Sequence, residues 1–345
     1  MAAAADARQP AFESGTRVAV LGLGVSGEAA ARLDVCDDAG PRAATDRLRA
    51  LGIDAESGTH DMDRIAACDL VIVSPGIGPT SDVRRQVLAK GIRTIAEVEL
   101  AWRDLEGGSI AITGTNGKTT TTGLVAHILT TDGTEAAAAG NIGRPLSDIV
   151  LGFPQPDWVA IELSSFQLAD METLSPDVGV LLNLSPDHLD RYEDVDSYYA
   201  DKGCLFANAT SSSAWVLNAD DPATDRLAGE AAGRRCHFSV SSRPAEGAWL
   251  DPDGMLRCRL PERGEETWGA AGELRLLGPH NVANALAAAL ACALVGTPGE
   301  AIQEALASFE PLPHRLQPIG ERDGVLWVND SKATNVTATA VAVRS

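Results

Sequence analysis

The sequence predicts an α/β fold in which helices cover mostly parallel sheets. Short apolar runs, each of a length typical of a buried strand, recur along the chain and are separated by segments compatible with helices. Two of these runs end in glycine-rich turns that lead into a helix, an arrangement typical of ligand-binding α/β proteins. A length of 345 residues, at about 100–200 residues per domain, indicates two or three domains.

Composition and charge exclude several classes of partner. Hydrophobic residues make up 45% of the chain and charged residues 22%, which is ordinary for a globular protein. The net charge is −20 without a block of like charges, so neither nucleic acid nor an anionic membrane surface is expected as a partner. Anionic ligands must therefore be held by local sites.

Cysteine usage and the apolar runs indicate a cytoplasmic protein. The six cysteines are scattered without a C-x-x-C pair, which favours free thiols over a disulfide framework or a zinc site. The first ten residues lack the basic and apolar regions of a signal peptide, and no apolar run reaches the ~18 residues of a membrane span. We therefore expect a soluble protein without membrane insertion. We also expect a monomer.

The first hundred residues begin with a strand at 17–21 and a G-x-G-x-x-G turn that starts at Gly22 and continues through Gly24. This spacing marks a dinucleotide fold, or simply a tight turn where a helix packs closely on a strand. The acidic residue expected about 20 positions on is displaced, because Asp37 comes earlier than that. Only nine residues separate Gly24 from the next plausible strand at 34–36, fewer than the ~10–12 that a crossover needs. We expect a shortened first helix or a lost piece here.

Strands and helices then alternate, as a parallel sheet requires. A serine cap and a terminal glycine delimit the first of the helices. The expected strands and helices, in chain order, are 70–73, 81–90, 93–95 and 96–105. The Gly107-Gly108 pair that follows is interpreted as a linker to a second domain.

The main functional signal is a strand, a glycine loop and a helix in that order. The apolar run 110–112 leads into the loop Gly114-Thr115-Asn116-Gly117-Lys118-Thr119, and a helix is expected over 119–129. In such a loop the N–H groups and the helix N-terminus face an anion, the lysine reaches the terminal phosphates, and the first hydroxyl binds Mg²⁺. Ile112 stands where the usual spacing has its first glycine, so the loop is shortened. The alternative is a structural turn; the flanking strand and helix favour nucleotide binding.

Polar residues follow later strands at the sheet edge where α/β proteins bind ligands. Glu162 ends the strand 158–161 and is well placed to hold Mg²⁺, the alternative being a solvated surface carboxylate. His188 follows the strand 178–182 among acidic residues and an arginine, which favours a ligand or metal contact over a structural role. Lys202 comes next, and its alternative is a surface lysine on a helix.

Lysine usage singles out the same positions. The chain has 24 arginines but only four lysines, which are Lys90, Lys118, Lys202 and Lys332. Because arginine serves wherever any cation is enough, a lysine in this chain favours a position that needs an ammonium or a neutral amine.

The remainder of the chain contains further strands, one long helix and a hinge. A hairpin is expected around the Asp-Pro-Asp-Gly turn at 251–254. Asn281 lies where the Ala-rich helix begins and is a candidate N-cap. The other expected features are a strand at 214–217, a buried helix over 282–295, a Pro-rich hinge at 309–313 and a strand at 325–328.

Together these motifs resemble the Mur ligase family, the ATP-dependent amide ligases that build the peptidoglycan stem peptide. The similar runs are G-T-N-G-K-T, G-N-I-G, E-L-S-S-F-Q-L and D-H-L-D-R-Y, in family order and over nearly the whole chain. The Ser-Ser-Phe-Gln run after Glu162 is most similar to the members that join D-glutamate to UDP-N-acetylmuramoyl-L-alanine. This implies a Rossmann-like domain for the UDP-substrate over 1–106, a P-loop-type ATPase domain over 107–310, and the start of a C-terminal Rossmann-like domain over 311–345.

The resemblance also implies roles for individual residues. Catalysis is assigned to Lys118, His188 and Lys202. The two Mg²⁺ ions are assigned to Thr119, Glu162, His188 and Lys202, with Lys202 carbamylated. ATP is assigned to the loop from Gly114 to Thr119 with Thr120, Asn281, Asn284, Arg315 and Asp330. The UDP-substrate and D-glutamate are assigned to Ser74, Asn141, Lys332, Thr334, Gly24 and Asp37.

One departure from the family is at Gln317, where an acidic residue is common. Family members also continue beyond the point at which this sequence stops. Only 35 residues lie in 311–345, fewer than the ~40 that fold readily alone, and a helix over 336–343 has nothing to pack on. We therefore expect a fragment with an incomplete D-glutamate site and impaired ligation.

The chemistry accounts for these residue types. A carboxylate must attack the γ-phosphate of ATP, and both are anionic, so two Mg²⁺ ions and Lys118 are needed to offset their charges. An amine then attacks the acyl phosphate to give the amide. A lysine that is desolvated enough to lose its proton can react with CO₂, and the carbamate offers oxygens to a hard cation. Domain closure is expected to exclude water.

Three other functions compete with this interpretation. The nearest is a sister ligase, either another Mur enzyme or a folylpolyglutamate synthetase, for which the same loop and lysine would serve. A nicotinamide-dependent oxidoreductase would explain the turn at Gly22 but not Lys118, Glu162, His188 or Lys202. A catalytically silent nucleotide-binding remnant is the third.

Overall fold

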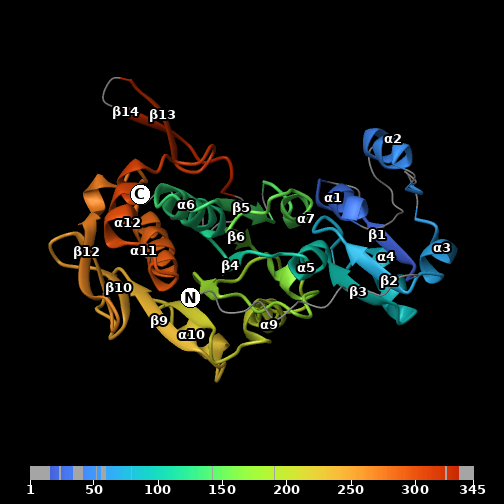
Figure 1. Ribbon diagram of the computed structural model, residues 1–345, viewed down its shortest axis with the longest axis horizontal. Coiled ribbons are helices and arrows are strands. Elements are labelled where there is room, and N and C mark those ends of the chain that lie inside the picture. The colour runs from blue at the N-terminus through green and yellow to red at the C-terminus, as the bar shows by residue number, and fades with distance from the viewer. Residues whose placement is uncertain are drawn as a thin grey trace.

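The structure is a computed structural model that describes residues 16–22, 25–33, 42–51, 53–55, 60–78, 80–141, 143–189, 191–322 and 325–333. Figure 1 shows an elongated molecule with a small sheet at one end, a large sheet in the centre and a hairpin that projects from the opposite side. The small sheet and its helices correspond to the first hundred residues. The predicted α/β fold is confirmed.

The N-terminal sheet contains three parallel strands in the order β1-β2-β3. They are β1 (Val18–Leu21), β2 (Leu70–Val73) and β3 (Arg93–Ala96). The first two are apolar and buried throughout, because helices cover both faces of the sheet. These helices are α1 (Val25–Leu33), α2 (Arg42–Ala50), α3 (Met62–Ala66), α4 (Asp82–Ala89) and α5 (Glu97–Arg103). The strand expected at 34–36 lies outside the described residues, so the expected defect in the first crossover stays a prediction.

The turn after β1 uses glycine for conformation and for space. Gly22 has φ of +92°, and a Cβ at Gly27 would lie only 1.8 Å from the carbonyl oxygen of Gly22. Helix α1 can therefore approach the end of β1 only because Gly27 has no side chain.

The central sheet has nine strands in the order β12-β11-β10-β9-β8-β7-β4-β6-β5. Seven of them are parallel, and β11 and β12 continue the sheet in antiparallel fashion. The strands are β4 (Gly108–Thr113), β5 (Ala136–Gly140), β6 (Trp158–Glu162), β7 (Val178–Leu181), β8 (Ala214–Asn218), β9 (Arg234–Ser239), β10 (Gly247–Leu250), β11 (Met255–Leu260) and β12 (Gly264–Ala270). The expected hairpin around 251–254 is confirmed as β10 and β11.

Alternate residues of the central strands enter two different cores. In β4, Ile110 and Ile112 pack on one face and Ala111 on the other, as the period of two in a strand requires. The first face is covered by α6 (Lys118–Thr131), α11 (Pro279–Leu294) and α12 (Gly299–Ser308), which lie together in Figure 1. The second face is covered by α5, α7 (Leu146–Val150), α8 (Ser165–Leu168), α10 (Pro222–Ala228) and the 3-10 turn η1 (Cys204–Phe206). Two further elements accompany the central sheet, α9 (Val195–Gly203) and the 3-10 turn η2 (Ala271–Glu273).

Helix α11 is the Ala-rich helix expected near residue 282. Its small side chains from Ala285 to Ala293 are buried and allow α11 to pack closely against α6 and the sheet. Pro279 occupies the first helical position after Gly278, where a missing N–H costs nothing. The candidate N-cap at Asn281 is therefore wrong, because Gly278 is the N-cap and Asn281 lies inside the first turn.

Two other sequence interpretations change. Gly108 is not part of a loose linker but the first residue of β4, and its N–H donates to the carbonyl oxygen of Asp157 at 2.8 Å. Gly107 is equally confined, since a Cβ there would lie 2.5 Å from the carbonyl oxygen of Pro156. Among the described helices, none is both long and apolar enough to cross a membrane.

After α12 the chain runs to a two-stranded antiparallel hairpin, β13 (Gln317–Arg322) and β14 (Val325–Asn329). Strand β14 confirms the strand expected at 325–328. The expected hinge at 309–313 has no regular structure, but Phe309 is buried and Leu312 packs on the core of the central sheet. The hairpin itself exposes Ile319 and Trp327.

Candidate active site

The site begins at the loop between β4 and α6. Gly114 and Gly117 have φ of +151° and +87°, conformations that favour glycine. A Cβ at Gly117 would also lie 2.3 Å from Oδ1 of Asn284. Gly117 caps α6 without a side-chain hydrogen bond among the described residues, so the first N–H groups of this helix face the loop. A 14-residue helix that begins at a glycine loop offers these N–H groups and its positive end to an anion.

A second loop holds the first in place. The N–H groups of Thr115 and Asn116 donate to the carbonyl and side-chain oxygens of Asn183, both at 2.9 Å, and Asn183 Nδ2 donates back to Asn116 O at 3.0 Å. Ser185 exchanges two further hydrogen bonds with Thr115, each of 3.0 Å. The sequence analysis missed Asn183 and Ser185. Their signal was present, since both directly follow the strand at 178–181.

Two lysines converge on one carbonyl group. Lys118 Nζ donates to the carbonyl oxygens of Gly114 and Thr115, and Lys202 Nζ donates to the same Gly114 oxygen, all at 2.9 Å. Lys202 is only 1% exposed, so the alternative of a surface lysine is wrong. Burial lowers the pKa of Lys202 well below its ordinary value, and the positive charge of Lys118 lowers it further. Burial also lowers the pKa of Lys118, while Glu162 opposes this effect.

Glu162 lies next to this pair at the end of β6. Its carboxylate is 1% exposed, which contradicts the alternative of a solvated surface residue. Asn141 Nδ2 donates to Glu162 Oε1 at 3.1 Å, and the Asn141 N–H donates to the Glu162 carbonyl at 2.9 Å. The structure therefore joins the Gly-Asn-Ile-Gly loop to the predicted metal ligand, and Thr113 completes the edge by donating to the Leu163 carbonyl at 2.8 Å.

His188 has an accessible ring that lies beside two aromatic side chains. Its backbone has φ of +53°, which is uncommon for a residue with a side chain, and its side chain is 45% exposed. The ring contacts Phe166 and Tyr198, with centroid separations of 5.3 and 6.1 Å. Tyr198 in turn lies under Lys202, whose Nζ is 4.7 Å from the ring centroid. The tertiary structure thus brings His188 and Lys202 to the same aromatic side chain.

The asparagines of α11 also reach the loop. Asn281 Nδ2 donates to the Leu277 carbonyl at 2.7 Å, and Asn284 Nδ2 donates to Asn281 Oδ1 at 3.1 Å. Both side chains are buried, and Asn284 lies against Gly117 as described above.

A segment from the far end of the chain contacts the start of α6. Arg315 Nη2 donates to Thr119 Oγ1 at 2.8 Å, and the Leu316 N–H donates to Asp330 Oδ1 at 3.1 Å. Lys332 has an exposed side chain and only its backbone N–H is fixed, by the His314 carbonyl at 3.2 Å. Arg315 is therefore placed at the loop, whereas the side chain of Lys332 is not. Thr334 lies outside the described residues.

The N-terminal part of the molecule, which is the sheet β1-β2-β3 with helices α1 to α5 and is called the N-terminal half below, contributes Ser74 at the end of β2. Its N–H donates to the Leu21 carbonyl at 2.9 Å, and a Cβ at Gly22 would lie 2.9 Å from the Cβ of Ser74. Ser74 thus lies at the carboxyl edge of the parallel sheet, where α/β proteins bind ligands. Gly24 and Asp37 lie outside the described residues.

The donor set fits a nucleotide with Mg²⁺. The described residues contain no group of three or more His, Cys, Asp or Glu side chains arranged to hold a metal by themselves. Mg²⁺ usually takes one or two protein carboxylates and completes its shell with water and phosphate oxygens. Glu162, whose charge acts on Lys118 in the glycine loop, matches that requirement.

Similarity to known proteins covers nearly the whole chain. Residues 112–292 match the family model of the Mur ligase middle domain. The UDP-N-acetylmuramoylalanine–D-glutamate ligase of Acidobacterium capsulatum is 39% identical over 342 residues, covering 96% of this chain and 74% of the relative. The ligase of the same name from Salinibacter ruber is 40% identical over 349 residues, covering 96% and 75%.

Solved structures show the same fold at low identity. A pseudomurein peptide ligase type C from Methanothermus fervidus matches with a TM-score of 0.58 and 21% identity, covering 95% of this chain and 76% of that one. UDP-N-acetylmuramate-alanine ligase from Thermotoga maritima matches with a TM-score of 0.56 and 21% identity, covering 92% and 75%.

Proposed function

The chain belongs to the Mur ligase family of ATP-dependent amide ligases, and we propose that it joins D-glutamate to UDP-N-acetylmuramoyl-L-alanine in peptidoglycan precursor synthesis. Family membership excludes the nicotinamide-dependent oxidoreductase. The observation that carries the proposal is the convergence of Lys118 and Lys202 on Gly114, beside the buried Glu162 and a glycine loop that opens a helix. The specific substrates are proposed from the names of relatives about 40% identical over nearly the whole chain.

In this proposal the loop from Gly114 to Thr120 binds the ATP phosphates. Its N–H groups face the anion. When ATP binds, the Lys118 ammonium gives up its hydrogen bonds to two loop carbonyl oxygens and donates to the terminal phosphates instead. Asn281 and Asn284 lie near the adenine, and Arg315 and Asp330 reach the nucleotide from beyond α12.

Thr119 and Glu162 would hold one Mg²⁺ ion, and His188 with a carbamylated Lys202 would hold a second. Bound Mg²⁺ supplies positive charge that stabilises the transferring phosphoryl group. Carbamylation needs the neutral amine: its nitrogen bonds to the carbon of CO₂ and one proton leaves. Because burial and the charge of Lys118 hold the pKa of Lys202 well below its ordinary value, the neutral amine is more accessible here than on an exposed lysine.

Ser74 and Asn141 would contact the UDP-substrate, one from each half of the molecule. We also assign Gly24 and Asp37 to this substrate, and Lys332 and Thr334 to D-glutamate. The substrate carboxylate attacks the γ-phosphate to give an acyl phosphate and ADP; the amine of D-glutamate then displaces phosphate and forms the amide. Water would hydrolyse the acyl phosphate, so the approach of Arg315 to Thr119 also serves to enclose the site. We propose a monomer that acts in the cytoplasm, where ATP is available.

Phosphate release by the purified chain tests this function. The mixture contains UDP-N-acetylmuramoyl-L-alanine, D-glutamate, ATP and Mg²⁺, and each component is omitted in turn. We expect release that requires all four, that L-glutamate does not support, and that is slow, because the sequence predicts an incomplete D-glutamate site and impaired ligation. Calorimetric titration with a non-hydrolysable ATP analogue and with the UDP-substrate tests the two binding sites separately. Absence of binding by the UDP-substrate, or release that responds to another amino acid and not to D-glutamate, would contradict the proposal.

A further inference from the structure

Helix α5 belongs to both halves of the molecule. Leu100 packs in the core of the N-terminal sheet, whereas Val98 and Trp102 pack in the core of the central sheet. The Trp102 indole N–H also donates to the carbonyl oxygen of Thr173 at 3.2 Å. A single short helix that follows β3 therefore carries packing contacts from one half to the other.

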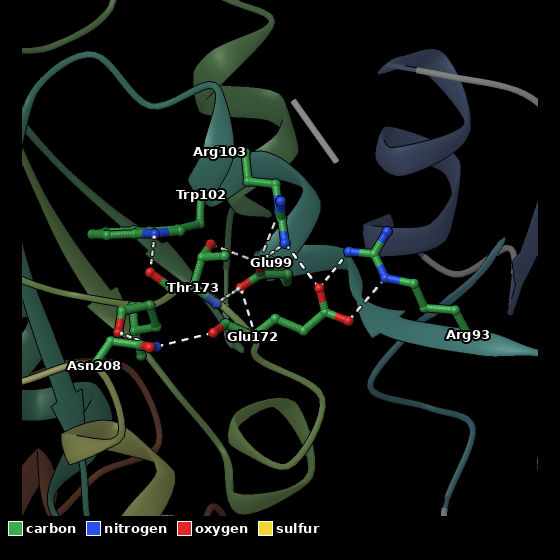
Figure 2. Close-up of polar contacts among 8 residues, drawn as sticks. Arg93, Glu99, Trp102, Arg103, Glu172, Thr173 and Asn208 are labelled. Carbon is green, nitrogen blue, oxygen red and sulfur yellow. Dashed lines mark hydrogen bonds and ion pairs between the residues drawn. The ribbon is translucent and has the colours of Figure 1, made fainter. Parts of the chain in front are cut away.

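Glu99 is the polar centre of this contact. Its side chain is fully buried and accepts hydrogen bonds from the N–H groups of Glu172 and Thr173 and from the Thr173 hydroxyl, at 3.1, 3.2 and 2.7 Å (Figure 2). Arg103, one turn further along α5, donates to the same carboxylate at 2.8 Å. Every partner is a donor, so only an ionised carboxylate satisfies all of them.

Ion pairs with arginines also hold the loop 169–174. Arg93 on β3 forms a two-point ion pair with Glu172, and Arg103 donates to Glu172 at 2.9 Å (Figure 2). Arg84 on α4 forms a buried ion pair with Asp170, whose carbonyl oxygen accepts from the Ala96 N–H at 3.0 Å. The loop 169–174 is therefore attached to three consecutive elements of the N-terminal half.

The start of α5 makes a second contact, with α7. Glu97 Oε1 accepts from the N–H and the hydroxyl of Ser147, at 2.9 and 2.5 Å. Helix α7 also lies beside α1 (Figure 1).

Both contacted segments lead directly from the candidate site. Helix α7 follows the loop that contains Asn141, and the loop 169–174 follows Glu162 through α8. Asn141 and Glu162 are themselves hydrogen-bonded. Ser164 and Gln167 form a capping box on α8, which restrains the backbone between Glu162 and the loop 169–174.

We infer that Glu99 is a positioning residue, which holds the N-terminal half at a fixed orientation so that Ser74 and Asn141 contact one UDP-substrate together. This inference rests on the proposed function. A ligand that contacts both halves depends on their relative orientation, because a shift of about 1 Å is enough to misplace a reacting group. The residues proposed to bind the nucleotide all lie in the central sheet or after α12, outside the N-terminal half, so nucleotide binding does not depend on this orientation.

Substitution Glu99→Gln tests the inference. The amide nitrogen of glutamine would face a donor at whichever oxygen it replaces, so at least one hydrogen bond of the Glu99 side chain is lost and the contact is weakened with little change in volume. Calorimetry should show the Kd of UDP-N-acetylmuramoyl-L-alanine raised about tenfold, and that of the Mg²⁺–ATP analogue changed by less than about twofold. Glu265→Gln is the matched control, because it removes a carboxylate paired with Arg243 in the outer strands and should change neither Kd.

A second variant covers the case in which Glu99→Gln does not fold. Thr173→Val removes only the hydroxyl donor to Glu99 and should weaken the UDP-substrate alone, by a smaller factor. If both variants fold, the double variant should be no weaker than Glu99→Gln, since the two residues act through one contact. Amide exchange should also quicken in 170–176 and not in the loop 114–119.

The outcomes separate the two proposals. If the unsubstituted chain does not bind the UDP-substrate, the result contradicts the proposed function itself, on which the positioning role rests. If it does, and Glu99→Gln keeps its affinity, the positioning role is overturned. Equal weakening of both ligands would mean a general loss of structure and would overturn it as well.

Discussion

At the scale of single residues, the site is defined by groups whose ordinary properties are changed by burial. Lys202 is the clearest case, because its ammonium shares the Gly114 carbonyl with Lys118 in a desolvated place. Burial and a like charge both favour the neutral amine. Arginine cannot lose its proton under these conditions, which gives a physical reason for one of the four lysines to occur here.

Lys202→Arg is therefore expected to lower the rate of phosphate release by on the order of 100-fold, the size of effect seen when one preorganised electrostatic group is removed. Arginine supplies a cation at this position but cannot be carbamylated, so the loss would report the missing carbamate rather than a missing cation. Lys90→Arg serves as the control, because Lys90 is exposed at the end of α4. Activity of Lys202→Arg equal to that of the unsubstituted chain would end the carbamate assignment.

A second residue prediction concerns pH and Glu97. Burial raises the pKa of Glu97 to about 7 from 4.5, and Ser147 only partly opposes this. The folded chain thus keeps a proton that the unfolded chain releases, so the stability this group contributes is complete below about pH 4.5 and is lost as pH rises through 7. The full difference corresponds to about 3 kcal/mol in the free energy of unfolding.

Glu97→Gln should remove this dependence. Its carbonyl oxygen can still accept from Ser147, and Oε2 of Glu97 has no hydrogen-bond partner among the described residues, so glutamine resembles the protonated acid. Urea unfolding at about pH 5 and about pH 8 should show a smaller fall in the variant. Parallel pH profiles for the two proteins would contradict the raised pKa.

At the scale of elements, the glycine loop and α6 depend on backbone conformation as much as on side chains. Gly117 is required both by its φ of +87° and by the 2.3 Å that would separate a Cβ from Asn284. Sequence spacing identified the loop, but not its contacts with Asn183 and Ser185. Those contacts join the ends of two strands, β4 and β7, that are adjacent only in the sheet.

Gly117→Ala should abolish binding of the ATP analogue and lower stability. The left-handed conformation alone costs about 1–2 kcal/mol for a residue with a Cβ, and the contact with Asn284 adds to it. Gly133→Ala is a matched control with φ of +84° and no atom within 4 Å of the added Cβ. It should show the conformational cost without the loss of nucleotide binding. Thermal unfolding and calorimetry measure the two effects, and an intact affinity in Gly117→Ala would contradict the assignment of the loop.

At the scale of the whole molecule, three parts of the chain are joined by contacts between residues that are distant in sequence. The N-terminal half is attached through α5, the central sheet provides the loop, and the segment after α12 returns to Thr119 through Arg315. The hairpin β13–β14 beyond Arg315 forms no sheet with the rest of the described chain. Arg315 and the contacts of 309–312 therefore fix its approach to the site.

Arg315→Ala is expected to loosen this segment. Limited proteolysis should cleave within 317–333 faster than in the unsubstituted chain, because the side-chain contact with Thr119 is lost. Glu321→Ala, at an exposed position of β13, should leave the cleavage rate unchanged. Equal cleavage in both variants would show that Arg315 does not hold the segment.

Much of the fold and part of the site could be predicted from the sequence. Apolar runs such as 70–73 and 178–181 gave correct strands, because burial on both sides of a parallel sheet requires continuous apolar residues. The glycine loop was predictable because its chemistry is local. The alternative of Asn281 as an N-cap is wrong because Gly278 and Pro279 start the helix earlier than composition indicates.

The sequence by itself determined what depends on neighbours along the chain: strands, helices, the glycine loop and the family. Only the tertiary structure decided which side chains meet, such as Lys202 with Gly114, Arg315 with Thr119 and Glu99 with Thr173. These pairs are far apart in sequence, and no local pattern encodes their distance. Burial and hydrogen-bond partners arise only when the sheets and helices pack, and with them the pKa values and orientations on which the proposed chemistry depends.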